Sequence, residues 1–132
     1  MSGIIGGAGS KSGVIGTTEL DYEEGTWTPT HTNASASNSG SYIKIGKKVF
    51  LEGWLASDGG ASGTTFGGLP FAGVTTGNSA GGGNTNYQNN ATSGLQYGIQ
   101  ISGSNFSFYN DATLVDFISG RQAGFHLSYT IA

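Results

Sequence analysis

Few side chains in this sequence are of the types that perform acid–base chemistry. The two histidines, His31 and His126, lie far apart along the chain, and neither sits in a recognisable catalytic motif. Hydrolysis needs a nucleophile, a base and an orienting acid that the fold brings together. A strand histidine satisfied by packing or by solvent is the simpler interpretation of each. We therefore expect no catalytic residue, no cofactor and no enzymatic activity.

Carboxylates are concentrated in one short stretch, where their oxygens could bind a hard cation such as Ca²⁺. The spacing does not fit an EF-hand loop, whose ligands recur at fixed positions. We favour a solvated acidic collar, or salt bridges between subunits to Lys44, Lys47 or Lys48. The sequence thus predicts no metal site. The members of this acidic cluster are Glu19, Asp21, Glu23 and Glu24.

A tyrosine surrounded by amides offers a third kind of chemistry, the binding of a glycan. Tyr87 lies among Asn86, Gln88 and Asn89. An aromatic platform beside hydrogen-bonding side chains suits a sugar ring and its hydroxyls. Because Ala72 to Gly94 is almost wholly small and polar, we expect an exposed loop there. That loop is a candidate glycan site, and a solvated loop with one packed tyrosine is the alternative.

Composition narrows the class of protein further. Glycine accounts for 25 of the 132 residues, charged residues make up 10%, and cysteine is absent. Such a chain is poor in helix formers, and it can form neither disulfides nor thiolate metal sites. The net charge of −3, with five Lys and Arg residues, argues against a nucleic-acid partner. No apolar run could span a membrane and no secretory signal is visible, so we expect assembly in a cytoplasm.

The elements that must position these residues are short antiparallel strands. Pro29 confines the first strand to an edge or a strand end. Gly46-Lys47 suits a two-residue type II′ turn, and Leu114 to Ile118 is either a short strand or a helical turn. The pattern predicts an antiparallel β-sandwich, with a jelly roll the version that we favour. The expected strands are Thr26 to His31, Tyr42 to Ile45, Lys48 to Leu55, Thr64 to Phe71, Leu95 to Ile101, Asn105 to Tyr109 and Gly124 to Ile131.

One predicted strand, Lys48 to Leu55, carries large apolar groups on both faces. Alternation places Val49, Leu51 and Leu55 on one side. On the other side lie Phe50, Glu52 and Trp54. We expect one side to face the core and the other to form a subunit interface or the opposite rim.

The N-terminal stretch differs from this body. Two apolar pairs, Ile4-Ile5 and Val14-Ile15, lie ten residues apart between glycines. Glycine-rich termini are often disordered tails. We favour instead an arm whose apolar pairs fill grooves on other subunits, while its glycines allow close backbone approach. The predicted division is an extended attachment arm at residues 1–20 and a folded knob at residues 21–132.

Three motifs follow one another in the knob, at Asp21 to Pro29, Gly40 to Phe50 and Gly68 to Phe71. Their order resembles the β-module of tailed-bacteriophage fibre and virion decoration proteins. That module reads Tyr-Glu-Glu-Gly-Thr-aromatic-Thr-Pro, then Gly-x-Tyr-x-Lys-Ile-Gly, then Gly-Leu-Pro-Phe. The likeness covers the chain from Asp21 onward.

The resemblance implies a homotrimeric β-sandwich on the virion surface, without catalytic function. Many relatives carry the module on a long fibre, whereas residues 1–20 alone precede it here. We therefore expect a capsid decoration or head-fibre subunit, assembled in the bacterial cytoplasm. Its arm would attach through Ile4, Ile5, Val14 and Ile15 to the major capsid protein or another virion protein. The alternative is a tail-fibre or tail-tip adhesin knob that binds a host-surface glycan near Tyr87.

Overall fold

The computed structural model describes residues 21–31, 38–57, 63–75, 81–89, 97–116 and 120–132. The described part of the chain is all-β and contains no helix. The predicted arm, with Ile4, Ile5, Val14 and Ile15, lies outside the described residues. The strands are β2 (Tyr22–Trp27), β3 (Ser39–Ile45), β4 (Lys48–Ala56), β5 (Gly81–Asn89), β6 (Gly98–Ser102), β7 (Asn105–Asn110), β8 (Thr113–Leu114) and β9 (Gln122–Thr130).

All eight strands belong to one antiparallel sheet, with the order β2-β3-β4-β9-β5-β6-β7-β8. Strand β9, which follows every other strand in sequence, lies in the middle between β4 and β5. It pairs with β4 from Gln122 to Thr130 and with β5 from Gln122 to Tyr129. The sheet is therefore joined at its centre by the strand that is last in the chain.

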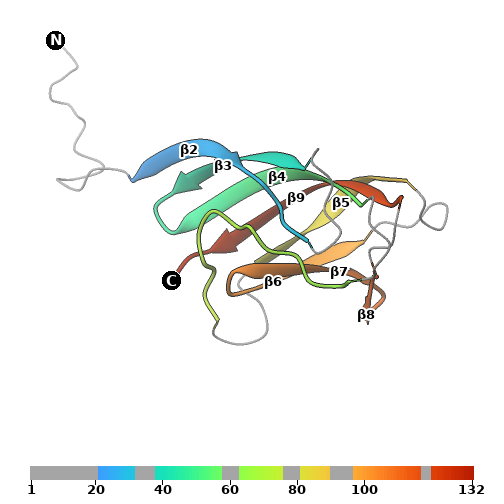
Figure 1. Ribbon diagram of the computed structural model, residues 1–132. Helices are drawn as coiled ribbons and strands as arrows, with labels where there is room; N and C mark the ends of the chain where they lie inside the picture. Colours follow the sequence, from blue (N-terminus) through green and yellow to red (C-terminus); the bar gives the residue numbers. More distant parts are fainter. Residues whose placement is uncertain (1–20, 32–37, 58–62, 76–80, 90–96, 117–119) are drawn as a thin grey trace, which may run out of the picture.

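The sheet curves so strongly that its two ends face each other across the core. Figure 1 shows β6 and β7 lying beneath the layer formed by β2, β3, β4, β9 and β5. The rings of Trp27 on β2 and Phe106 on β7 lie 6.0 Å apart, edge to face. Between these ends, backbone bridges join Phe66 to Phe106 and Gly67 to Thr30. The segment 63–75 thus ties the residues that follow β2 to strand β7.

Aromatic side chains fill the concave face of this sheet. Phe66, Phe106, Phe108 and Phe125 are almost fully buried, and each ring contacts at least one of the others. Such edge-to-face and offset contacts add to the stabilisation from burial alone. The core also contains the inward residues of β4 and β9, which are Val49, Leu51, Leu55, Ala123, Leu127 and Tyr129.

The predicted central hairpin is confirmed. Strands β3 and β4 pair from Ile45↔Lys48 outward, which leaves Gly46-Lys47 as the two-residue turn. Gly46 has a φ of 57°, as the first central residue of a type II′ turn requires. Strand β2 lies at the edge of the sheet and ends before Pro29, in keeping with the missing N–H of proline.

Two predicted elements are wrong, and a third is misplaced, since the strand expected at Thr26 to His31 is β2 at Tyr22–Trp27. Thr64 to Phe71 is not a regular strand, because only Phe66 and Gly67 make bridges. The expected loop from Ala72 to Gly94 instead contains β5, an interior strand between β9 and β6. A Cβ on Gly83 would lie only 2.0 Å from the carbonyl oxygen of His126. Here glycine permits close packing of neighbouring strands, and it does not mark a flexible tip.

Candidate functional site

The convex face of the sheet, opposite the core, is the most unusual surface of the described residues. We call it the outer face, and it spans β2, β3, β4, β9 and β5. Phe50, Glu52 and Trp54 of β4 point to it, as their alternation with buried Val49, Leu51 and Leu55 requires. Two open hollows lie along it and share Ser41 and Glu52 in their walls. The outer face therefore offers both apolar and polar groups to a partner.

One end of the outer face carries four large apolar side chains, beside the charged residues Glu24 and Lys48. Tyr22, Ile43, Ile45 and Phe50 are all exposed, although such side chains are usually buried. Their register brings them together, since Tyr22 lies opposite Ile45 and Ile43 lies opposite Phe50. We call these four residues the apolar patch. Contiguous exposed apolar side chains of this kind mark surfaces that contact another molecule.

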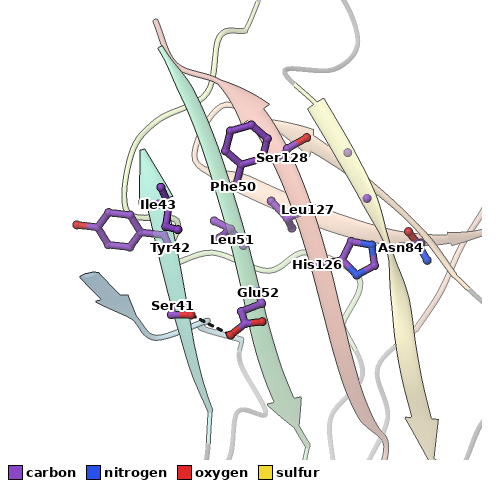
Figure 2. Close-up of a pocket in the computed structure, with 12 residues that line it drawn as sticks. Ser41, Tyr42, Ile43, Phe50, Leu51, Glu52, Asn84, His126, Leu127 and Ser128 are labelled. Atoms are coloured by element: carbon purple, nitrogen blue, oxygen red, sulfur yellow. Dashed lines mark hydrogen bonds between the residues drawn. The ribbon is translucent and has the colours of Figure 1, made fainter. Parts of the chain in front are cut away.

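A hollow of about 610 Å³ adjoins the apolar patch. Figure 2 shows Phe50 and Ile43 at one part of it, His126 on the neighbouring strand β9, and Asn84 beyond it on β5. The Ser41 hydroxyl donates a hydrogen bond of 3.0 Å to Oε1 of Glu52 and so orients that carboxylate. The hollow is wide and open, and its walls mix apolar and hydrogen-bonding groups.

A pair of aromatic rings occupies the other end of the outer face. The ring centroids of Trp54 on β4 and Tyr87 on β5 lie 5.4 Å apart, and their planes meet at 31°. Both residues stand opposite Gly124 of the intervening strand β9. A second hollow, of about 490 Å³, is lined by this pair together with Glu52 and Asn86. Because Gly124 has no side chain, no group of β9 projects between the two rings.

A β-bulge places Tyr87 on this face. Thr85 lies opposite Phe125, and Tyr87 lies opposite the adjacent residue, Gly124. Asn86 is therefore the extra residue of the bulge. In an unbroken strand Tyr87 would share the inward direction of Thr85, because side chains alternate with a period of two. The bulge instead turns Tyr87 outward, where it meets Trp54.

Thr85 holds the bulge from the buried side. Its side chain is fully buried, and its Oγ1 accepts hydrogen bonds from the Tyr97 N–H at 3.0 Å and from Nε2 of Gln88 at 2.8 Å. The Thr85 N–H also donates to the Tyr97 carbonyl oxygen. One buried hydroxyl thus ties Thr85, next to the bulge, to the Tyr97 backbone and to the Gln88 side chain.

The acidic cluster forms contacts within the chain. Nζ of the buried Lys44 pairs with Oδ2 of Asp21 at 2.5 Å, so this expected partner belongs to the same chain. The Tyr42 hydroxyl donates to Glu23, and the resulting hydrogen bond raises the pKa of Tyr42. Tyr22 donates to Glu24 in the same way, with the same effect on its pKa. Glu19 lies outside the described residues, and those described include no metal-binding group of acidic, His or Cys side chains.

The two histidines do not approach each other. His31 stacks on Phe66 with ring centroids 4.5 Å apart, and burial lowers its pKa below the ordinary value. His126 lies exposed on the outer face beside Glu52, its register partner on β4. No described segment forms a helix of the length and apolarity that a membrane crossing needs.

The predicted glycan residues lie on a strand and are divided between its two faces. Tyr87 and Asn86 line the second hollow, and Asn89 is exposed at the end of β5. Gln88 turns inward to Thr85. The partner of Tyr87 is Trp54, which the sequence placed on the outer side of its strand but did not connect with Tyr87.

Comparison of the chain with protein-family models, with curated proteins and with solved structures gives no match.

Proposed function

We propose that this chain is a structural subunit of a tailed-bacteriophage virion, a capsid decoration or head-fibre protein that forms a homotrimer. The apolar patch is the observation that carries this proposal. Its Tyr22 and Ile45 are the tyrosine and isoleucine of the phage motifs that the sequence resembles. These motif side chains point away from the core of their own chain. Residues exposed in this way are suited to assembly with other subunits.

Limited burial within one chain also favours assembly. Much of β5 is glycine, so the inner face of that strand contributes few side chains to the core. Small domains with a modest core commonly gain stability through oligomerisation. In this proposal the curved sheet is one subunit's jelly-roll sandwich, the apolar patch contacts neighbouring subunits, and residues 1–20 attach the trimer to the major capsid protein or another virion protein.

The attachment role is tested by deleting residues 1–16. The truncated protein should retain the melting temperature and oligomeric state of the full chain, since the deletion keeps every residue of the predicted knob at residues 21–132. It should fail to incorporate into phage particles when it replaces the full chain during infection. Normal incorporation of the folded truncated protein would contradict attachment through the arm.

The assembly role is tested on the apolar patch. The double variant Ile43→Ser/Phe50→Ser should shift the protein from trimer to monomer in analytical ultracentrifugation. Leu114 on β8 provides a matched control, because it is 46% exposed, against 48% for Phe50, and lies outside the patch. Leu114→Ser should therefore leave the trimer intact. A monomeric wild-type protein, or a double variant that remains trimeric, would contradict the proposal.

A second candidate function is an adhesin knob that binds a host-surface glycan. The pairing of Trp54 with Tyr87 favours it, because this pair lies in a hollow with polar side chains and is separate from the apolar patch. Aromatic surface beside hydrogen-bonding groups is typical of sites that orient a small polar ligand.

A further inference from the structure

We propose that Trp54 and Tyr87 form the platform of a carbohydrate site, and that its ligand is a neutral pyranose within an oligosaccharide. This inference deepens the adhesin candidate and does not depend on where the protein sits in a particle. It concerns the second hollow, which opens over β4, β9 and β5.

The first argument is the exposure of the rings. Tyr87 is 50% exposed and Trp54 is only partly buried, yet they lie side by side. Two adjacent rings present a broad apolar surface with polar atoms at its margin. The C–H face of a pyranose ring is apolar in the same way, and its hydroxyl groups point outward from the ring edge. Stacking would therefore bury apolar area on both partners while the hydroxyls stay accessible.

The second argument is the bulge. A tyrosine needed only for core packing could follow the strand alternation and turn inward beside Thr85. Instead, the extra residue Asn86 turns the ring out, and the buried hydrogen bonds of Thr85 hold that arrangement. Bulges commonly re-aim a side chain next to a functional site. The bulge in β5 therefore fixes the outward direction of Tyr87.

The third argument concerns the polar groups around the platform. Among the described residues, neither the Asn86 carboxamide nor the Trp54 indole N–H has a hydrogen-bond partner, so both are available to a ligand. Glu52 is exposed, and its carboxylate is oriented by Ser41 at 3.0 Å. A fixed carboxylate accepts strong hydrogen bonds from vicinal hydroxyls.

The charges select among sugars. Of the described residues that line this hollow, Glu52 is charged and none is Lys or Arg. An acidic sugar such as a uronic acid would place its carboxylate near that of Glu52 without a cation to compensate. A neutral hexose meets no such repulsion. The geometry therefore favours neutral over acidic saccharides.

A glycan array and saturation-transfer NMR test the inference on the full chain. The array should show binding to glycans with neutral hexoses. In the NMR titration, cellotetraose and galactotetraose serve as neutral probes and a tetragalacturonate as the acidic probe. We expect saturation of the C–H protons of a neutral probe at millimolar concentration, and weaker or no transfer to the acidic one. Absence of binding both on the array and to the neutral tetrasaccharides would overturn the proposal.

Alanine variants test whether the saccharide binds at the platform of Trp54 and Tyr87. Trp54→Ala and Tyr87→Ala should each weaken binding by about tenfold, which corresponds to roughly 1.4 kcal/mol. Both side chains are partly exposed, so the melting temperature should change little, and circular dichroism would confirm folding. Phe50→Ser lies outside the platform and should bind as the wild type does. Undiminished binding by folded Trp54→Ala would overturn the assignment of the platform. Loss of the trimer in the Ile43→Ser/Phe50→Ser variant would not affect that assignment.

Discussion

Replacing Thr85 with valine tests whether one buried hydroxyl holds the bulge that exposes Tyr87. Valine has nearly the shape of threonine, so the core packing around this fully buried position is retained. The change removes the acceptor of the Tyr97 N–H, which lies 3.0 Å from Oγ1. Because Tyr97 is only 4% exposed, water cannot readily replace that acceptor. The variant therefore leaves a buried donor unsatisfied.

The expected cost follows from that donor. An unsatisfied buried polar group costs about 1–3 kcal/mol, and the added methyl offsets part of it. We expect a net loss of about 1–2 kcal/mol in the free energy of unfolding, or a melting temperature lower by roughly 4–8 °C for a chain of this size. The bulge should also loosen, so the ring contact between Trp54 and Tyr87 should weaken.

Urea denaturation measures the loss, and amide hydrogen exchange at Tyr97 locates it. Thr85→Ser is the control, since it keeps the hydroxyl and loses only a methyl group. Serine should preserve the protection of the Tyr97 amide, whereas valine should remove it and reduce the Trp54–Tyr87 cross-peaks in NMR spectra. If the Tyr97 amide stays equally protected in both variants, the hydroxyl does not hold the bulge and the reasoning is refuted.

Two further predictions concern the core. Gly83→Ala should destabilise the protein by about 3 kcal/mol in urea denaturation, because its Cβ would meet the His126 carbonyl oxygen at 2.0 Å. Gly98→Ala, where the nearest atom is 3.9 Å away, should leave stability unchanged within about 1 kcal/mol, and equal losses would contradict the close approach of β5 to β9. Burial raises the pKa of Tyr129 to about 12, so its neutral form is favoured in the folded state. The stabilisation of the fold by neutral Tyr129 is complete below the unfolded pKa of about 10 and is lost as the pH rises towards 12. In urea denaturation, the difference in unfolding free energy between the wild type and Tyr129→Phe should therefore shrink across that window. A difference that stays constant would contradict this prediction.

Local patterns predicted the β3–β4 hairpin and the orientation of its side chains. The turn glycine Gly46 and the alternation from Val49 to Leu55 are encoded within a few consecutive residues. The outward direction of Trp54 followed from the same alternation. The first strand was predicted less well, because it was expected at Thr26 to His31, whereas β2 is Tyr22–Trp27 and Pro29 lies beyond its end.

Strand β5 could not be predicted in this way. Its glycines have no side chains to show a period, and they are required by the backbones of β9 and β6, which come from later parts of the chain. The same reason concealed the platform. Tyr87 faces outward only because Thr85 and Tyr87 lie opposite consecutive residues of β9. This pairing depends on both strands, so it cannot be predicted from the residues of β5 alone.

The central position of β9 also sets an order of events during synthesis. A ribosome delivers β4 and β5 well before β9, so each of these strands first emerges with an open edge where β9 will later lie. Open edges can pair with other nascent chains, especially where many copies are made at once. Among the eight strands, only β9 pairs with both halves of the sheet. Premature termination before Gln122 would therefore leave β4 and β5 each with an unpaired edge, and we expect it to cause aggregation instead of a smaller folded protein.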